Sequence, residues 1–238
     1  MPYQTVIRID PDAIMLEPLD LDQTDFQSPL PKQHFHLIFE DAAIGMAVGI
    51  WDTTTMQEAF GPYPGDEFIT VLEGRFAILD GAGIAVIGEA GQSAVFRNAI
   101  PVSWKQEGYL RKIYLTLQTP EADVPKIGSA SGGVLVLDAD RAAPVATGVD
   151  GVAREVLFRN DAGNMTVTHI THPALDLPPV QTGAHELCRV LAGEITLTDP
   201  AGHTHRFGPG SHFFLPGGVA CARSISNGTS ALHVIVTP

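Results

Sequence analysis

Glu67 and Glu186 occupy equivalent positions in two segments of the chain that repeat each other. Residues 67–91 and 186–210 align without a gap at a spacing of 119 residues, which is half of the 238-residue chain. Both glutamates begin alternating segments typical of a β-strand with one buried face. A carboxylate on the buried face is costly unless a metal ion, a cationic side chain or hydrogen-bond donors compensate its charge. The two glutamates are therefore the leading candidates for catalytic residues.

In the first copy, Glu67 is accompanied by side chains that could support acid–base chemistry or hold a ligand. Lys112 and Tyr114 share one face of the strand expected over residues 110–118, so an acid, an amine and a phenol could meet in one pocket. The expected catalytic residues of this copy are Glu67, Lys112 and Tyr114, and its expected substrate-binding residues are Trp51, Tyr63 and Trp104. A structural ion pair inside an aromatic core explains the same pattern, and both interpretations stay open.

In the second copy, the residues around Glu186 raise the question of a metal site. Seven of the 9 histidines lie in this half of the chain. A thiolate, a carboxylate and imidazoles would suit Zn²⁺ or Fe²⁺ better than Mn²⁺. The candidate ligands are Glu186, Gln181, Cys221, His212 and His233, and Cys221 is also an expected substrate-binding residue. The alternative is that the histidines are exposed strand residues and that no metal binds here. No other cofactor is predicted.

Cys188 and Cys221 are the only cysteines, far fewer than the disulfide framework of a small secreted protein requires. Both are expected to face the interior of the second copy, where they could approach each other. A reactive thiol there would need a neighbouring cation, such as His212 or Arg223, to lower its pKa. A buried cysteine can equally serve as a small core residue.

The elements that must position these residues are short strands joined by turns. The chain has 24 glycines and 18 prolines, 45% hydrophobic and 17% charged residues, and no stretch with convincing helical periodicity. A polar, small-residue segment at 120–133 reads as a linker. We therefore expect an all-β protein with two domains, residues 1–122 and residues 123–238.

Charge and hydropathy limit the classes of partner. A formal net charge of −13 and a pI near 4.9 disfavour nucleic acids and anionic membranes as partners. The longest apolar run, residues 42–51, is about half of what a membrane-spanning helix needs. The first residues do not follow the pattern of a signal peptide. We expect a cytoplasmic protein that binds a small molecule.

Several short motifs give the chain a family resemblance. Glu186 and Gly193 fit the pattern E(x)6G, and Gly210, Pro216 and Gly218 fit the opening of the second cupin motif. The first copy resembles ethanolamine-utilisation-type cupins in its segments at 51, 66–68, 72–74, 104 and 112–114. The doubled arrangement is similar to the bicupins that include ureidoglycine aminohydrolase. The resemblance covers most of residues 45–118 and 164–237, and it implies two tandem jelly-roll (double-stranded β-helix) barrels and a homodimer, or a monomer whose two barrels mimic one.

The same resemblance indicates that the standard metal site is incomplete. A metal-binding cupin would place two histidines just before the glutamate and a third in the Pro-Gly strand. The positions before Glu67 hold Phe60 and Pro62, and the third position holds Val102, so we expect the first barrel to be metal-free. In the second barrel the three positions hold Pro179, Gln181 and Cys221.

An earlier segment, His34, His36 and Glu40, has the spacing HxH(x)3E of a metal-binding cupin motif. The 119-residue register, however, aligns it with residues 153–160, a strand that precedes the glutamate strand of the second copy. We therefore interpret these histidines as surface or rim residues.

Three hypotheses about function remain open. The first is a bicupin that binds a small polar or carboxylate-bearing metabolite without the standard metal. The second is a metal-dependent hydrolase or lyase, resembling ureidoglycine aminohydrolase, that acts on a nitrogenous metabolite. The third is a structural or regulatory protein without catalysis. The missing histidines favour the first hypothesis over the second.

Overall fold

The computed structural model describes residues 5–118, 133–138, 141–144 and 151–238. This part of the chain consists of β-strands, two single-turn 3₁₀ helices and connecting loops, and it contains no α-helix. The all-β prediction is therefore confirmed. Among these residues there is no helix long and apolar enough to cross a membrane.

The chain divides into two compact units. We call Pro11–Ala139 the N-terminal unit, and we call Met1–Asp10 together with Asp140–Pro238 the C-terminal unit. The predicted domain boundary at residues 122 and 123, and all of the predicted linker except Gly133, lie outside the described residues.

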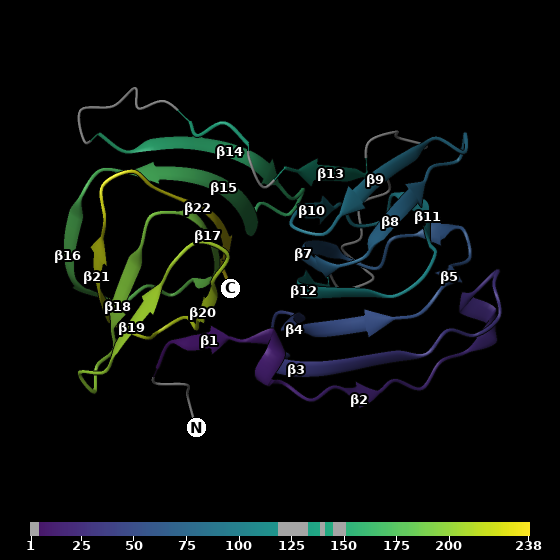
Figure 1. Ribbon diagram of the computed structural model, residues 1–238, viewed down its shortest axis with the longest axis horizontal. Coiled ribbons are helices and arrows are strands. Elements are labelled where there is room, and N and C mark those ends of the chain that lie inside the picture. The colour runs from purple at the N-terminus through teal and green to yellow at the C-terminus, as the bar shows by residue number, and fades with distance from the viewer. Residues whose placement is uncertain (1–4, 119–132, 139–140, 145–150) are drawn as a thin grey trace. The chain divides into compact units, whose positions relative to one another are not determined.

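The N-terminal unit contains two antiparallel sheets (Figure 1). The larger has the strand order β13-β10-β7-β12-β4-β3-β2, and the smaller has the order β5-β11-β8-β9 with β6 also paired to β11. The strands are β2 (Glu17–Pro18), β3 (Gln33–Asp41), β4 (Met46–Thr53), β5 (Met56–Gln57), β6 (Gly61–Pro62), β7 (Asp66–Glu73), β8 (Arg75–Leu79), β9 (Ala85–Glu89), β10 (Ser93–Phe96), β11 (Pro101–Gln106), β12 (Leu110–Leu117) and β13 (Val134–Leu137). The 3₁₀ helices are η1 (Pro11–Ala13) and η2 (Gln23–Asp25).

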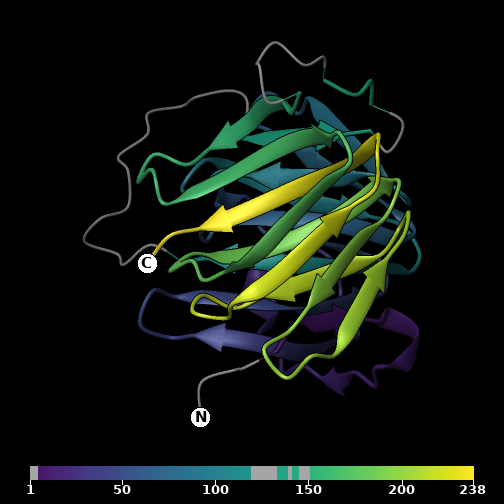
Figure 2. The same cartoon turned by 90° about the vertical axis from the view of Figure 1, so that its left-hand side faces the viewer.

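The C-terminal unit also contains two antiparallel sheets, with the orders β1-β20-β17-β22-β15-β14 and β16-β21-β18-β19. Its green and yellow strands lie side by side facing the viewer in Figure 2. The strands are β1 (Ile7–Ile9), β14 (Ala153–Arg159), β15 (Met165–His172), β16 (Leu175–Val180), β17 (His185–Ala192), β18 (Ile195–Thr198), β19 (Thr204–Phe207), β20 (His212–Leu215), β21 (Cys221–Ile225) and β22 (Thr229–Val236).

Each unit has an apolar core to which both of its sheets contribute. In the N-terminal unit, Ile69 and Phe96 from the larger sheet cluster with Phe76 and Trp104 from the smaller one. In the C-terminal unit, Cys188 and Phe213 cluster with residues such as Leu197, Phe207 and Cys221. Packing two sheets face to face over such a core is the arrangement of a jelly-roll-like fold.

The first strand of each half of the chain pairs within the unit formed by the other half. β1 pairs with β20, Ile7 opposite Phe214, and Val6 and Ile9 are buried. β13 pairs with β10, Leu135 opposite Val95, and Leu137 is buried. The boundary between residues 122 and 123 stays a prediction. It rests on local sequence patterns, which do not reveal these pairings between strands far apart in the chain.

The turn after each glutamate strand requires glycine. Gly74 and Gly193 follow β7 and β17 and have φ values of 83° and 75°. A Cβ atom at Gly74 would collide with the carbonyl oxygen of Tyr109, and one at Gly193 with the hydroxyl of Thr229. Glycine therefore permits a tight turn at each position, and the turn returns the chain towards the neighbouring strands.

Candidate functional site

Strand alternation turns both glutamates towards the interior of their units. On β7, Glu67 shares a face with Ile69 and Val71, which belong to the apolar core. On β17, Glu186 shares a face with Cys188 and Val190, which belong to the other core. The two glutamates are 7% and 6% exposed, so each carboxylate depends on neighbouring protein groups for compensation.

In the N-terminal unit, Lys112 compensates the charge of Glu67. Lys112 Nζ lies 2.9 Å from Glu67 Oε1, and the side chains of both residues are 9% exposed. The second carboxylate oxygen, Oε2, accepts a hydrogen bond from the hydroxyl of Tyr63. Lys112 comes from β12, which pairs directly with β7 in the same sheet. The structure thus brings together the acid, the amine and one of the two phenols in a single hydrogen-bonded group.

Two tryptophans surround the ammonium group of Lys112. Its Nζ lies 4.9 Å from the ring centre of Trp51 and 4.8 Å from that of Trp104. The two indole rings meet edge to face at 6.3 Å. Phe76 and Phe96 stack on Trp104 at 4.5 Å and 5.5 Å, which holds that indole in place. The cation is therefore stabilised by Glu67 on one side and by aromatic faces on others.

These side chains line a cavity of about 230 Å³. Its lining contains all six candidates predicted for the first copy, Trp51, Tyr63, Glu67, Trp104, Lys112 and Tyr114. Gln33, Glu58, Pro64, Thr116 and Gln118 complete it. The sequence alone predicted that these six residues share a pocket, and the structure places them there.

Both phenols of the cavity stay protonated at neutral pH. Burial, together with Glu67 and Glu40, raises the pKa of Tyr114 to about 12. Burial and the hydrogen-bonded Glu67 carboxylate raise the pKa of Tyr63 well above its ordinary value. The two tyrosines therefore act as hydrogen-bond donors rather than as bases in this cavity.

Glu58 is a cavity residue that the sequence analysis missed. It follows β5 in a polar segment, and no pattern in that segment distinguishes it. Its side chain is half-buried. Burial raises its pKa to about 7; Lys112 opposes this rise, and Glu67 and Asp25 add to it. A carboxyl group with a pKa near neutrality in a cavity is suited to proton transfer or to charge-dependent binding.

In the C-terminal unit, a guanidinium compensates the charge of Glu186. Arg223 Nη1 donates to Oε1 at 3.1 Å, and Nη2 donates to Oε2. The Nδ1 atom of His233 lies 2.7 Å from Oε1. Burial opposes ionisation of Glu186, but Arg223 and His233 outweigh it and lower the pKa of this carboxyl far below its ordinary range. Arg223 was proposed from sequence only as a neighbour of the thiols, so its pairing with Glu186 is a new observation.

Glu186, Cys188 and His233 form a group that could hold a metal ion. One potential ligand atom from each residue lies within 4.8 Å of the others, and all three residues are buried. Sulfur, nitrogen and oxygen donors fit a soft or borderline metal such as zinc or iron. Burial lowers the pKa of His233, but Cys188 and Glu186 outweigh it and raise this pKa to about 10. A metal would therefore have to displace a proton from His233 and compete with Arg223 for Glu186.

The other metal ligands proposed from sequence lie elsewhere. His212 is opposite Arg189 in the β17–β20 register, on the face of the sheet away from Glu186 and Cys188. The structure therefore does not bring His212 together with Glu186, because its strand partner Arg189 follows Cys188 on β17 and so points to the opposite face. Cys221 is 2% exposed and packs in the apolar core, where burial raises its thiol pKa. Gln181 is exposed and lines a different cavity.

The histidines of the early motif have other contacts. His34 Nδ1 lies 2.7 Å from Asp52 Oδ1, across the β3–β4 pair, and the His34 side chain is 38% exposed. Glu40 is exposed. These positions agree with the interpretation of the motif as rim residues rather than ligands.

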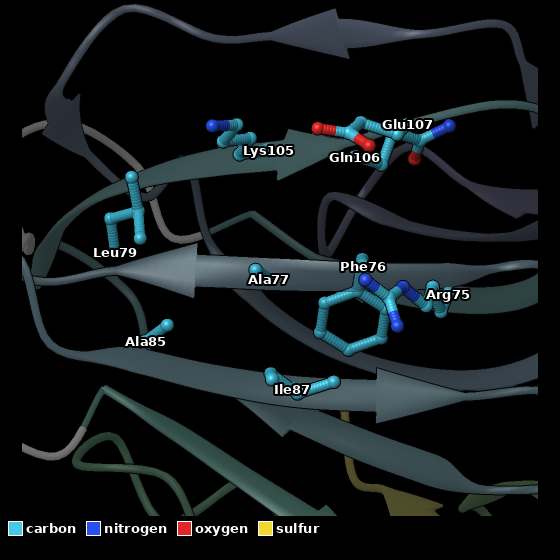
Figure 3. A pocket seen from close by; sticks show the side chains of 9 residues that line it. All are labelled: Arg75, Phe76, Ala77, Leu79, Ala85, Ile87, Lys105, Gln106 and Glu107. Atoms are coloured by element: carbon cyan, nitrogen blue, oxygen red, sulfur yellow. The ribbon is translucent and has the colours of Figure 1, made fainter.

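Two further cavities contain none of the residues expected to act in catalysis. One, of about 280 Å³, lies on β8, β9 and β11 and is lined by residues such as Arg75, Ile87 and Lys105 (Figure 3). The other, of about 840 Å³, lies in the C-terminal unit, where Asp199, His203 and Gln181 line it. Neither contains a buried pair of opposite charges like that of Glu67 and Lys112.

Comparisons with known proteins identify the fold. Residues 178–230 match the family model described as EutQ-like cupin domain. A protein of unknown function of family DUF861 from Pseudomonas syringae pv. tomato is similar, with a TM-score of 0.74, 18% identity, and coverage of 98% of this chain and 100% of that one. A cupin 2 conserved barrel domain protein from Leptotrichia buccalis has a TM-score of 0.58, 12% identity, and coverage of 95% and 99%.

A variant of salicylate 1,2-dioxygenase from Pseudoaminobacter salicylatoxidans, solved with gentisate, has a TM-score of 0.56, 12% identity, and coverage of 81% of this chain and 69% of that one. No curated protein matches the chain. At these identities the structural matches show the fold, which is a cupin fold, and not an activity.

Proposed function

We propose that this cupin-fold protein binds a small polar or carboxylate-bearing metabolite in the cavity of its N-terminal unit, and that it does so without a metal ion. The observation that carries the proposal is the buried pair of Glu67 and Lys112, 2.9 Å apart, at the wall of an aromatic cavity. The lining of this cavity contains neither histidine nor cysteine. Its polar groups are instead an ammonium, two carboxylates, two phenols, a threonine hydroxyl, two indole N–H groups and side-chain amides.

Lys112 has donor capacity left for a ligand. An ammonium carries three N–H donors, and one of them is directed to Glu67 Oε1. The indoles of Trp51 and Trp104 stabilise the charge without accepting a conventional hydrogen bond. A ligand carboxylate or carbonyl oxygen could accept a further hydrogen bond from Nζ. A purely structural ion pair would not need an open cavity beside it.

We also propose that the two units are tandem cupin barrels derived from one repeat. The strand pairs β4 and β15, β7 and β17, and β12 and β22 begin and end at the 119-residue spacing. The hydrogen bonds of one turn also occur in both units at this spacing. Asp80 Oδ1 accepts from the amides of Ala82 and Ile84, and Asp199 Oδ1 accepts from those of Ala201 and His203.

A ligand screen by thermal shift tests the binding proposal. The panel consists of small carboxylates, amino acids and ureido acids, and the variants are Glu67→Gln and Lys112→Met. A ligand that raises the melting temperature of the native protein should lose this effect in both variants. Glu107→Gln is the matched control, because Glu107 is exposed and outside the cavity. An unchanged ligand response in both cavity variants would place the binding site elsewhere.

A metal-dependent enzyme, either a hydrolase or a lyase, is the second candidate function. The group of Glu186, Cys188 and His233 favours it. Metal analysis of the purified protein tests it, with Cys188→Ser and Cys221→Ser as a matched pair of variants. Stoichiometric metal that is lost in Cys188→Ser but kept in Cys221→Ser would support a metal site at Glu186. Equal metal content in both variants would count against it.

A further inference from the structure

We propose that the cavity of the N-terminal unit selects ligands that carry a positively charged amino group, and that the carboxylate of Glu58 binds this group. The inference rests on the proposed binding function of the same cavity and specifies the class of ligand. Together with Lys112, which can bind a carboxylate, it points to a small amino acid as the ligand.

The charges of the cavity are unevenly compensated. Glu67 has both an ammonium and a phenol as partners. Glu58 lines the same cavity, and within the described residues its carboxylate takes part in no hydrogen bond or ion pair. Two carboxylates therefore share one ammonium, Lys112. A cationic ligand would supply the second positive charge.

The backbone of Glu58 is held firmly at the cavity wall. Its N–H donates to the carbonyl oxygen of Trp104 at 2.8 Å. Its own carbonyl oxygen accepts a hydrogen bond from Ser103 Oγ at 2.7 Å. Both partners lie on β11, next to the indole that forms part of the cavity. These two bonds therefore fix the backbone position from which the Glu58 side chain reaches the cavity.

The groups around Glu58 favour the binding of a cation by its carboxylate. Burial raises its pKa to about 7; the ammonium of Lys112 on β12 opposes this rise, whereas Glu67 on β7 and Asp25 on η2 add to it. Near neutral pH the carboxyl group is thus divided between its protonated and ionised forms. A bound ammonium would favour the ionised form, so the protonated fraction of Glu58 would release its proton to solvent while the ligand keeps its own.

The aromatic walls suit the same ligand. The faces of Trp51 and Trp104 already stabilise the ammonium of Lys112 at 4.9 Å and 4.8 Å. Such faces attract organic cations and leave the carbon chain of a ligand in an apolar environment. An amino group at Glu58 and a carboxylate at Lys112 would then engage two of the three charged side chains of the lining, while the third, Glu67, keeps its pairing with Lys112.

Isothermal titration calorimetry with three small probes tests the inference. The probes are 3-aminopropanoate, propanoate and propylamine, each titrated between pH 5.5 and 8.5. We expect 3-aminopropanoate to bind more tightly than propanoate. Its affinity should rise roughly 30-fold over this pH range, as the ionised fraction of Glu58 rises. At pH 7, titrations in buffers of different ionisation enthalpy should show release of a fraction of one proton for each 3-aminopropanoate bound.

Glu58→Gln should lower the affinity for 3-aminopropanoate and propylamine at least tenfold at pH 8.5 and abolish the pH dependence and the proton release. It should leave propanoate binding unchanged or stronger. Glu107→Gln, which removes the same charge outside the cavity, should behave like the native protein. If Glu58→Gln does not fold, Glu58→Asp should retain the pH dependence with weaker binding.

The outcomes separate this inference from the binding proposal. Equal binding of propanoate and 3-aminopropanoate, without pH dependence, would overturn the role of Glu58 and leave the cavity as a binding site. Unchanged amine binding in Glu58→Gln would overturn it as well. Failure of all three probes to bind the folded native protein would count against both proposals.

Discussion

Arg223 donates from both of its terminal nitrogens to the two carboxylate oxygens of Glu186. In the N-terminal unit the equivalent glutamate, Glu67, is compensated by Lys112, which comes from β12. The residue 119 positions after Lys112 is Ala231, and the residue 119 positions before Arg223 is Trp104. Each unit therefore compensates its buried glutamate with a lysine or arginine, but this residue comes from a different strand in each, and Glu186 has His233 as a further partner. A buried carboxylate requires compensation, and more than one strand can provide it.

The pair of Glu67 and Lys112 should matter for stability as well as for binding. Lys112→Met keeps most of the side-chain volume but leaves Glu67 buried without its cation. We expect the free energy of unfolding to fall by ~3–5 kcal/mol, measured by urea denaturation at pH 7.

Two variants make the test of this pair specific. Adding Glu67→Gln to Lys112→Met removes the uncompensated charge and should recover part of the loss. Lys105→Met, at an exposed position of the same unit, should change stability by less than about 0.5 kcal/mol. A loss in Lys112→Met no larger than that in Lys105→Met would contradict the interpretation of a buried, interdependent pair.

Arg223 should limit metal binding by the C-terminal unit. Its guanidinium engages both oxygens of Glu186, so a metal ion at Glu186, Cys188 and His233 has to compete with it. Arg223→Met should therefore raise the affinity for Zn²⁺ at least tenfold, measured by competition with a chelating dye at pH 7.5. Zn²⁺ should also recover the melting temperature that the variant loses.

The double variant Arg223→Met, Cys188→Ser is the control for this effect, since it removes one of the three donors. Zn²⁺ affinity that stays the same in Arg223→Met as in the native protein would show that Arg223 does not occupy the metal position. In that case the pairing of Glu186 with Arg223 and the binding of a metal ion by Glu186 would be independent of each other.

His212 should make the protein sensitive to acid. Burial and the neighbouring Arg189 lower its pKa from 6.5 to about 3. As pH falls below 6.5 the unfolded chain binds a proton that the folded state does not, so stability is lost between pH 6.5 and about 3. The slope from this residue is at most about 1.4 kcal/mol per pH unit.

Urea denaturation from pH 4.5 to 7.5 measures this dependence. His212→Gln should flatten the decline, whereas His203→Gln, at a side chain that is 75% exposed, should leave it as in the native protein. Parallel stability curves for His212→Gln and the native protein would show that this histidine is not responsible.

The exchanged edge strands should be detectable by hydrogen exchange. Ile9 is 4% exposed on β1, and Ile9→Ala should destabilise the pairing of β1 with β20 by ~2–5 kcal/mol. Amide protection should fall at residues 212–215 and stay unchanged at residues 93–96, measured by mass spectrometry.

Leu137→Ala on β13 is the reciprocal variant, and it should affect residues 93–96 instead. Loss of protection at residues 93–96 in Ile9→Ala would contradict the strand exchange seen in the structure.

The candidate site of the N-terminal unit was largely predictable because it depends on local rules. Strand alternation places Glu67 on the inner face of β7, and it places Lys112 and Tyr114 on one face of β12. Adjacent antiparallel strands with apolar inner faces then bring the acid and the amine together. These relationships follow because successive side chains of a β-strand point to alternate faces of the sheet.

Other features depend on which distant segments meet, and the local pattern contains no information about that. Arg223 reaches Glu186 from the other sheet of its unit, and Glu58 enters the cavity from a loop. The same holds for the exchange of β1 and β13 between the two halves of the chain.

By itself, the sequence determined the all-β class, the positions of the two inward glutamates and the aromatic environment of the first one. It could not determine the partner of Glu186, because Gln181, Cys221, His212 and His233 were all compatible with the spacing. Only the tertiary structure decided that His233, Cys188 and Arg223 surround this carboxylate. The physical reason is that a buried charge is compensated by whichever side chains the long-range strand pairing brings within hydrogen-bonding distance.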